Sequence, residues 1–145
     1  MNIMFICTGN ICRSAMAHGL LEKRLKDLKK DEQIKVFSCG VYAENGADAT
    51  YNSIEAIKKY DVDLRNHKST NIRNSNIQNM DLILCATNAH KEEVIYLYPD
   101  LADKVFTLKE NGNINDPYGY DMDIYINCAK EIAKCIEILL DKILK

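Results

Sequence analysis

Apolar and polar residues follow two different periods along the chain, and these periods predict a repeating order of strand and helix. Short apolar runs, typical of strands buried on both faces, occur at residues 3–6, 34–39, 81–86 and 104–108. Helical spacing of apolar residues follows over residues 15–30, 48–60, 88–98 and from about 121 onward. This alternation predicts an α/β domain with a parallel sheet that helices cover on both faces.

The ends of the expected helices carry recognisable signals. Thr87 or Asn88 can cap the third helix, and Pro99 ends it. Acidic residues at 121–123 suit the start of the last helix. Residues 62–79 are polar and rich in asparagine, so we expect an irregular segment with short helical turns at most. The inner face of the last helix is expected to contain apolar residues at intervals of three and four: Ile124, Cys128, Ile132, Cys135, Leu139 and Ile143.

One stretch between the first strand and the first helix combines a nucleophile with an anion-binding loop. It reads Cys7-Thr8-Gly9-Asn10-Ile11-Cys12-Arg13-Ser14. Such a loop directs successive backbone N–H groups into one concavity at the positive end of a helix dipole. Ligands of parallel sheets bind beyond the carboxyl ends of the strands, which is where Cys7 is expected. The stretch therefore predicts a site for a tetrahedral oxyanion.

The side chains of this loop suit nucleophilic attack on a bound anion. Helix N-termini and nearby cations lower the pKa of a cysteine from about 8.5 to roughly 3.5–7.5, so we expect Cys7 to be a thiolate. Arg13 can grip two oxygens of a phosphate, and Ser14 can donate its hydroxyl to the thiolate. Gly9 permits close backbone approach, and Asn10 tolerates a left-handed conformation. The alternative is a buried structural cysteine in an ordinary turn, and Arg13 at this spacing argues against it.

Composition restricts the class of protein. The 145 residues suit a single domain, and 28% charged with 47% hydrophobic residues are ordinary values for a soluble globular chain. Nineteen basic and 21 acidic side chains give a net charge of −2, which does not suggest binding to nucleic acid or to an anionic membrane. No apolar run approaches the roughly 20 residues of a membrane helix.

The cysteines and histidines do not form recognisable disulfide or metal patterns. No secretory leader is visible at the N-terminus, and Cys39, Cys85, Cys128 and Cys135 lie in apolar contexts, so we expect free thiols in a reducing cytoplasm. The three histidines, at positions 18, 67 and 90, lack paired ligand spacing, and we expect no metal site.

Two motifs make the chain resemble the low-molecular-weight protein tyrosine phosphatases: Cys-x-Gly-Asn-Ile-Cys-Arg-Ser at residues 7–14 and Asp-Pro-Tyr at residues 116–118. The resemblance covers nearly the whole chain, as one domain of this type over residues 1–145. It departs at Ala15, where the family usually has proline in the first helical turn, and that change removes no catalytic group.

This resemblance implies a fold, a reaction and a set of ligands. The sheet would have four strands in the order 2-1-3-4. The enzyme would hydrolyse a phosphotyrosine-containing protein or another aryl phosphate through a phosphocysteine intermediate on Cys7, without a cofactor. Inorganic phosphate or another oxyanion would occupy the loop, whose lining would comprise Thr8, Gly9, Asn10, Ile11, Cys12 and Ser14 beside Arg13.

A proton donor for the leaving group is expected between the fourth strand and the last helix, at Asp116. Pro117 restricts Asp116 to extended geometry and so limits where its carboxyl group points. Taken alone, Asp-Pro is a common turn signal. By resemblance, Asp116 is the general acid that protonates the departing phenolic oxygen and then the general base that activates water.

Supporting residues are assigned by the same resemblance. In the family, a serine that ends the second strand and a later histidine brace the asparagine of the loop, and Ser38, His67 and Asn10 match these positions. Without the resemblance, His67 is a surface histidine in a polar loop. We expect His18 to be a solvent-facing helix residue.

Cys12 has two interpretations. It can pack against the sheet as a small apolar side chain. By resemblance, the second cysteine of the loop can instead form a reversible disulfide with the nucleophile, which protects the nucleophile from irreversible oxidation. The short separation in one tight loop favours the second interpretation.

Substrate choice depends on residues around the loop. Tyr118 and Tyr120, with Tyr42 from the loop after the second strand, can form aromatic walls around a phosphorylated ring. Residues 87–91 resemble members of the family that act on phosphoarginine. Those members typically carry threonine where this chain has Ile11, which cannot offer a hydroxyl to a phosphoramidate, so Ile11 favours phosphotyrosine.

Two other activities deserve comparison. An arsenate reductase of this fold would need two further cysteines near the third strand, and only Cys85 lies there. An inactive phosphate-binding module would not need Cys7, Arg13 and Asp116 together.

Overall fold

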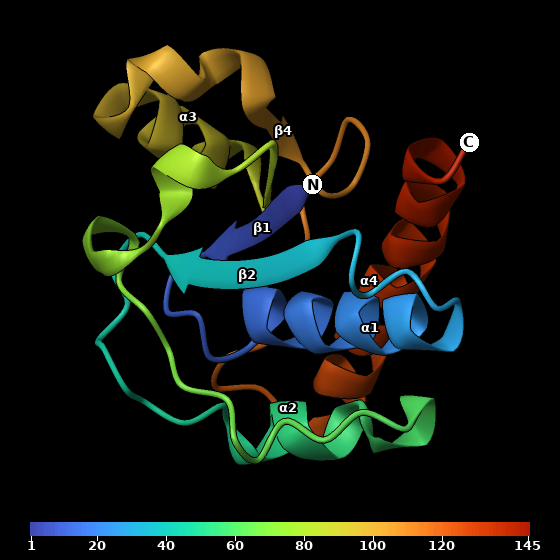
Figure 1. The fold of residues 1–145 in the computed structure, drawn as a ribbon. Helices are drawn as coiled ribbons and strands as arrows, with labels where there is room; N and C mark the ends of the chain where they lie inside the picture. Colours follow the sequence, from blue (N-terminus) through green and yellow to red (C-terminus); the bar gives the residue numbers. More distant parts are fainter.

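Four parallel strands form a central sheet in the order β2-β1-β3-β4, as expected (Figure 1). The computed structural model describes all of residues 1–145. The strands are β1 (Asn2–Cys7), β2 (Lys35–Gly40), β3 (Leu82–Cys85) and β4 (Val105–Thr107). In the register, Cys7 is level with Gly40 and Ile6 with Cys85, so these three strands end along one edge of the sheet.

Helices cover both faces of the sheet. The four α-helices are α1 (Arg13–Asp27), α2 (Tyr51–Ala56), α3 (Asn88–Leu97) and α4 (Met122–Ile143). Short 3-10 turns occupy Lys58–Tyr60, Ile72–Asn74, Ile77–Asn79 and Pro99–Lys104. Figure 1 shows α1, α2 and α4 on one side of the sheet and α3 on the other. None of these helices combines the length with the apolar composition that a membrane span requires.

The alternation of side chains along β1 divides the hydrophobic core into two layers. Ile3 and Phe5 point to the side of α1 and α4, where most of the buried side chains gather. Met4 and Ile6 point to the opposite side and pack with Val94 of α3. Both layers are buried because β1 lies at the centre of the sheet, and this explains its uninterrupted apolar sequence.

Side-chain caps set two of the predicted helix starts. Thr87 Oγ1 accepts a hydrogen bond from the backbone N–H of His90 at the start of α3. Asp121 Oδ1 accepts one from the N–H of Ile124 at the start of α4. Both caps satisfy N–H groups that the first turn of a helix leaves unpaired, as expected.

Several predicted bounds are wrong. The helix expected over residues 48–60 is confined to α2, because Thr50 caps its start and Asp61, at φ 61°, ends the following 3-10 turn in a left-handed conformation. The first helix ends at Asp27 rather than at residue 30. Ile124 is 43% exposed, and Tyr125 occupies the core in its place. The buried face of α4 follows Tyr125, Cys128, Ala129 and Ile132, so the periodic interpretation was wrong only at the first turn.

Candidate active site

Residues 8–12 form a turn of backbone between β1 and α1 whose N–H groups have no acceptor within the protein. Asn10 has a φ of 57°, the left-handed conformation expected from its residue type. Directly after this turn, α1 begins at Arg13. The free donors and the helix N-terminus together form a site where an oxyanion would be stabilised.

The thiol of Cys7 receives a directed hydrogen bond from Ser14. Ser14 Oγ lies 2.9 Å from Cys7 Sγ, and Asn10 Nδ2 donates to the same Oγ at 2.8 Å. Because Oγ already accepts from Asn10, its own proton is available to Cys7. The backbone N–H of Ser14 also points to Sγ, at 3.5 Å. Two donors, the hydroxyl and the backbone N–H of Ser14, therefore face the sulfur.

Asn10 is completely buried and held from three directions. Its Oδ1 accepts from the N–H of Thr70 at 2.9 Å, which fixes the amide so that Nδ2 faces Ser14. His67 Nε2 lies 2.7 Å from the Asn10 carbonyl oxygen, which can only accept, so Nε2 is the donor. His67 therefore supports the loop through the backbone of Asn10. Burial lowers the pKa of His67, and the neutral ring can make this bond.

The loop also lies directly against the end of β2. A methyl group at Gly40 would meet the Thr8 carbonyl oxygen at 2.4 Å and the Asn10 nitrogen at 2.9 Å. These are backbone atoms, which cannot move without moving the loop itself. Glycine at position 40 is therefore required by the close approach of two backbone segments.

Arg13 is buried, with 5% exposure, and its guanidinium is only partly paired. Nη1 donates to the carbonyl oxygen of Ile114 at 2.9 Å, which fixes the plane of the group. Nη2 lies 3.6 Å from Asp116 Oδ2. The remaining nitrogen, Nε, is buried with no partner in the protein. A buried donor without an acceptor is costly, and a bound oxyanion would satisfy it.

Asp116 lies where its carboxylate faces both Arg13 and solvent. Its side chain is 51% exposed, and Oδ1 accepts from the backbone N–H of Tyr118 at 3.1 Å. That hydrogen bond and the extended geometry before Pro117 orient the carboxyl group. The structure thus brings Asp116 beside Arg13 although they are separated by most of the chain.

The sequence interpretation missed a second histidine that holds the loop. His90 contacts Thr8 Oγ1 through Nε2 at 2.8 Å and Thr87 Oγ1 through Nδ1 at 2.9 Å. Burial, followed by the nearby charge of Arg13, lowers the pKa of His90 to about 4, so the ring is neutral near physiological pH. The cap signal at Thr87 indicated the helix start, but no pattern linked the third residue of that helix to Thr8.

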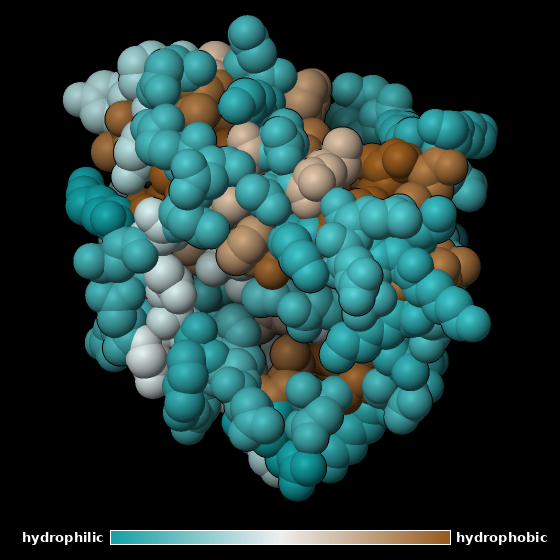
Figure 2. Space-filling view, viewed as in Figure 1, coloured by the Kyte–Doolittle hydropathy of each residue, from teal (hydrophilic) through white to brown (hydrophobic).

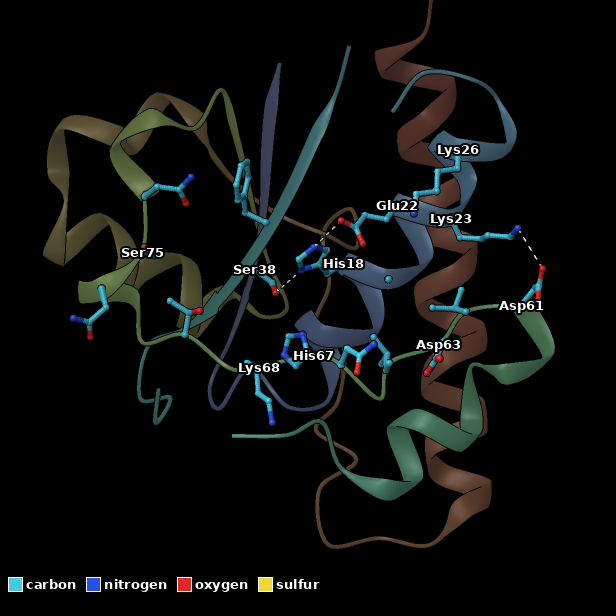
Figure 3. Close-up of a pocket in the computed structure, with 18 residues that line it drawn as sticks. His18, Glu22, Lys23, Lys26, Ser38, Asp61, Asp63, His67, Lys68 and Ser75 are labelled. Carbon is cyan, nitrogen blue, oxygen red and sulfur yellow. Dashed lines mark hydrogen bonds and ion pairs between the residues drawn. The ribbon is translucent and has the colours of Figure 1, made fainter. Parts of the chain in front are cut away.

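The predicted role of Ser38 is wrong. Ser38 does not contact Asn10: its hydroxyl lies 2.8 Å from His18 Nδ1, and His18 Nε2 lies 3.3 Å from Glu22 (Figure 3). The ring of His18 meets that of His67 edge-on, with 6.3 Å between ring centroids. With its side chain 23% exposed, His18 is therefore not the solvent-facing residue that was expected. The helical turn of α1 carries it between Ser38 and His67.

These two histidines border a polar cavity of about 770 Å³ that lies beside the loop (Figure 3). Its lining includes His18, Ser38 and His67, but not Cys7, Arg13 or Asp116. No cluster of three or more His, Cys, Asp or Glu side chains could hold a metal ion.

Cys12 is buried away from solvent against α4. Its Sγ lies 3.4 Å from the Tyr125 hydroxyl and 3.6 Å from Thr50 Oγ1. Burial raises the pKa of the Cys12 thiol. All six cysteines are free, so both the packing and the redox interpretation of Cys12 remain compatible with its position.

The three tyrosines proposed as aromatic walls are exposed. Tyr42, Tyr118 and Tyr120 have exposed fractions of 69%, 61% and 64%. The Tyr42 hydroxyl contacts Glu93 at 3.4 Å. Ile11 is half-buried and packs against the main core beside α2. These rings are accessible to a ligand, and the backbone N–H of Tyr42 donates to the Thr8 carbonyl oxygen at 3.0 Å, which places Tyr42 next to the loop.

Comparison with known proteins gives a consistent result. The family model described as "Low molecular weight phosphotyrosine protein phosphatase" matches residues 2–145. A protein-arginine-phosphatase of Bacillus subtilis is 33% identical over 100% of this chain and 98% of its own length. The low molecular weight protein-tyrosine-phosphatase PtpB of Staphylococcus epidermidis is 31% identical over 94% of this chain and 95% of its own.

Solved structures agree with this assignment. The low molecular weight protein tyrosine phosphatase of T. tengcongensis is 36% identical, with a TM-score of 0.92 over 98% of this chain and 99% of its own. The Wzb protein of Vibrio vulnificus, in complex with benzylphosphonate, is 26% identical, with a TM-score of 0.88 over 97% of both chains.

Proposed function

This chain belongs to the low molecular weight phosphotyrosine protein phosphatase family, and from its site geometry we propose that it hydrolyses phosphotyrosine in proteins through a phosphocysteine intermediate. The observation that carries the proposal is the buried Arg13 Nε, which has no protein partner and lies in the same site as the free N–H groups of residues 8–12 and Cys7. Together they are suited to a phosphoryl group with several negatively charged oxygens.

The first chemical step transfers the phosphoryl group to sulfur. The loop N–H groups and Arg13 bind the non-bridging oxygens, and Cys7 Sγ attacks phosphorus in line with the leaving oxygen. The S–P bond forms as the P–O bond breaks, and Asp116 gives its proton to the phenolic oxygen. Fixed donors around the phosphoryl oxygens stabilise the transition state without reorganisation.

The second step regenerates the thiolate. Asp116, now a carboxylate, takes a proton from water, and the oxygen of that water attacks phosphorus as the P–S bond breaks. Inorganic phosphate leaves, and Ser14 again donates to the sulfur anion. Both steps use only groups of the chain, the phosphorylated substrate and one water molecule, and neither step requires a cofactor.

Ile11 supports phosphotyrosine over phosphoarginine. Its apolar side chain offers no hydrogen bond to the nitrogen of a phosphoramidate, whereas it can pack against a phenolic ring. Exposed Tyr118 and Tyr120 lie two and four residues after Asp116 and extend the apolar surface available to that ring. A cytoplasmic location belongs to the same proposal, because all six cysteines are free thiols.

Phosphoarginine is the second candidate substrate. Proteins described as protein-arginine-phosphatases from Bacillus subtilis and Geobacillus stearothermophilus are 33% and 32% identical to this chain over nearly its whole length. His90, which contacts Thr8, belongs to residues 87–91, the segment that resembles family members acting on phosphoarginine.

A side-by-side assay separates the candidates. Peptides carrying phosphotyrosine, phosphoarginine or phosphoserine at the same position would be compared by kcat/KM with the wild-type enzyme and with Cys7→Ser. We expect phosphotyrosine to be preferred and Cys7→Ser to be inactive on all three. A preference for phosphoarginine would reverse the substrate assignment, and residual turnover by Cys7→Ser would contradict the mechanism.

A further inference from the structure

A groove of about 950 Å³ separates α4 from the outer half of the sheet, away from the reacting groups. Its floor contains Leu84 of β3 and Phe106 of β4, which are register partners and therefore lie on the same face. Phe106 is 49% exposed although it stands on a sheet face. On the opposite face, β4 is covered, because Val105 packs with Val94 of α3. On the face of the sheet that α4 packs against, no helix therefore covers β4.

The wall of the groove is one continuous stripe of α4. Ile138, near the middle of its C-terminal half, is 54% exposed. Figure 2 shows hydrophobic side chains gathered near this half of α4, among polar neighbours. The stripe spans about 24 Å, or four to five helical turns. Its members recur at intervals of three and one: Asn127, Lys130, Glu131, Lys134, Cys135, Ile138, Leu139, Lys142 and Ile143.

The rims of the groove are basic. Five lysines and two glutamates line it, a local net charge of +3 in a chain whose net charge is −2. Lys109 pairs with Glu131 at 2.8 Å, and Lys142 pairs with Glu110 at 3.7 Å. Lys91, Lys130 and Lys134 have no ion pair within the chain, and they stand on both sides of the apolar floor: Lys91 from α3, and Lys130 and Lys134 from α4.

We propose that this groove docks an acidic amphipathic helix of a partner protein. Such a helix would place its apolar face over Phe106 and Ile138 and supply the helical layer that this edge of the sheet lacks. Its flanking carboxylates would pair with Lys91, Lys130 and Lys134. The two ion pairs across the groove are solvent-exposed and offer little resistance to such an exchange.

The positive charge on the rims of the groove favours an acidic helix over two other possible occupants, a second copy of this chain and a fatty-acid anion. A two-fold dimer through the groove would set the same unpaired lysines of two copies against one another, which is unfavourable. A fatty-acid anion has one head group, and it would leave most of the cations on the two rims unpaired. A helix with acidic residues along both borders of its apolar face matches the distribution of charge.

The test uses the full chain and a synthetic helical peptide of about four turns with leucine along one face and glutamate along both borders. Binding would be followed by isothermal titration and by amide chemical-shift changes. We expect saturable binding, with shifts at Phe106, Leu108 and α4, that weakens about tenfold when Lys130→Glu and Lys134→Glu are combined. The matched control combines Lys26→Glu, in the last turn of α1, with Lys29→Glu, just after the end of that helix. It has the same charge change and should bind as the wild type does.

Further controls separate charge from apolar contact and docking from folding. Ile138→Ser should also weaken binding, and a peptide with lysine in place of glutamate should not bind. Hydrolysis of an aryl phosphate should be unchanged in all these variants, which shows that they are folded. Equal binding by the groove and control variants would overturn the proposal. So would dimerisation through this face, or displacement of the peptide by laurate at equal concentration.

Discussion

Ser14 Oγ lies 2.9 Å from Cys7 Sγ and accepts a hydrogen bond from Asn10 Nδ2, so its proton is directed at the sulfur. A hydrogen bond to a charged group contributes about 1.5–3 kcal/mol, and Ser14→Ala should therefore lower kcat by roughly 10- to 150-fold. Steady-state kinetics on an aryl phosphate provides the measurement. Ser75→Ala, which removes a hydroxyl bonded to Ile72 instead, is the control, and an equal loss in both variants would contradict this role.

Asp116→Asn should affect substrates according to their leaving groups. The amide keeps the shape of the side chain but cannot supply a proton, so hydrolysis of phenyl phosphate should slow by about 10²–10⁴-fold. Substrates such as p-nitrophenyl phosphate, whose leaving group departs as a stable anion, should lose much less. Comparable slowing of both substrates would show that Asp116 acts by holding Arg13, 3.6 Å away, rather than by proton transfer.

Gly40→Ala should disable the loop without entering the site. The added methyl group would meet backbone atoms of Thr8 and Asn10, and a displacement of about 1 Å in a catalytic loop can cost 100-fold in rate. Gly46→Ala is the control. An added methyl group at Gly46 would have no atom within 4 Å, but the φ of 86° at this position is unfavourable for alanine, so the substitution should lower stability. The unfolding temperature and the steady-state activity of both variants would be measured. Gly40→Ala should lose activity, whereas Gly46→Ala should be less stable but keep its activity.

Acid should destabilise the protein partly through His90. Its pKa is lowered to about 4 in the folded state, whereas an unfolded histidine titrates near 6.5. Between these pH values the unfolded chain binds more protons, so the free energy of unfolding falls as pH falls, by less than about 1.4 kcal/mol per pH unit for this group. Burial lowers the pKa of His67 and acts in the same direction.

Urea denaturation at several pH values measures this effect. His90→Gln should be less stable than the wild type near neutral pH, because its contacts with Thr8 and Thr87 are disturbed. Its stability should, however, decline less steeply between about pH 6.5 and pH 4. Parallel curves for the two proteins would show that His90 is not neutral in the folded state.

Cys12 should make oxidation of Cys7 reversible. Peroxide converts the Cys7 thiolate to a sulfenic acid, and the Cys12 thiol can then displace water to form a disulfide. Burial raises the pKa of Cys12, so we expect this second step to be slow. After brief peroxide treatment, dithiothreitol should restore more activity to the wild type than to Cys12→Ser. Equal recovery would favour the simple packing role beside Tyr125.

Much of the site could be predicted because its parts are neighbours in the sequence. Cys7, Asn10, Arg13 and Ser14 lie within one strand-loop-helix unit, so their spacing already implies that they surround the same point. The position of Asp116 between the fourth strand and the last helix already indicated the loop side of the sheet, where it lies 3.6 Å from Arg13, whereas its role as proton donor was assigned by family resemblance and stays a prediction. The resemblance assigned the wrong contact to Ser38. A serine is present at the expected position, but its hydroxyl lies against His18 and not against Asn10.

Local sequence patterns were enough to predict the succession of strands and helices along the chain, the buried character of β1 and the anion-binding loop, since hydrophobic period, caps and turn residues act over a few neighbouring positions. The packing of the elements, by contrast, brings His90 to Thr8 and Ile114 to Arg13, and it leaves one edge of the sheet uncovered beside α4. These contacts join residues separated by large parts of the chain. They depend on how whole elements pack against one another, which no local pattern encodes.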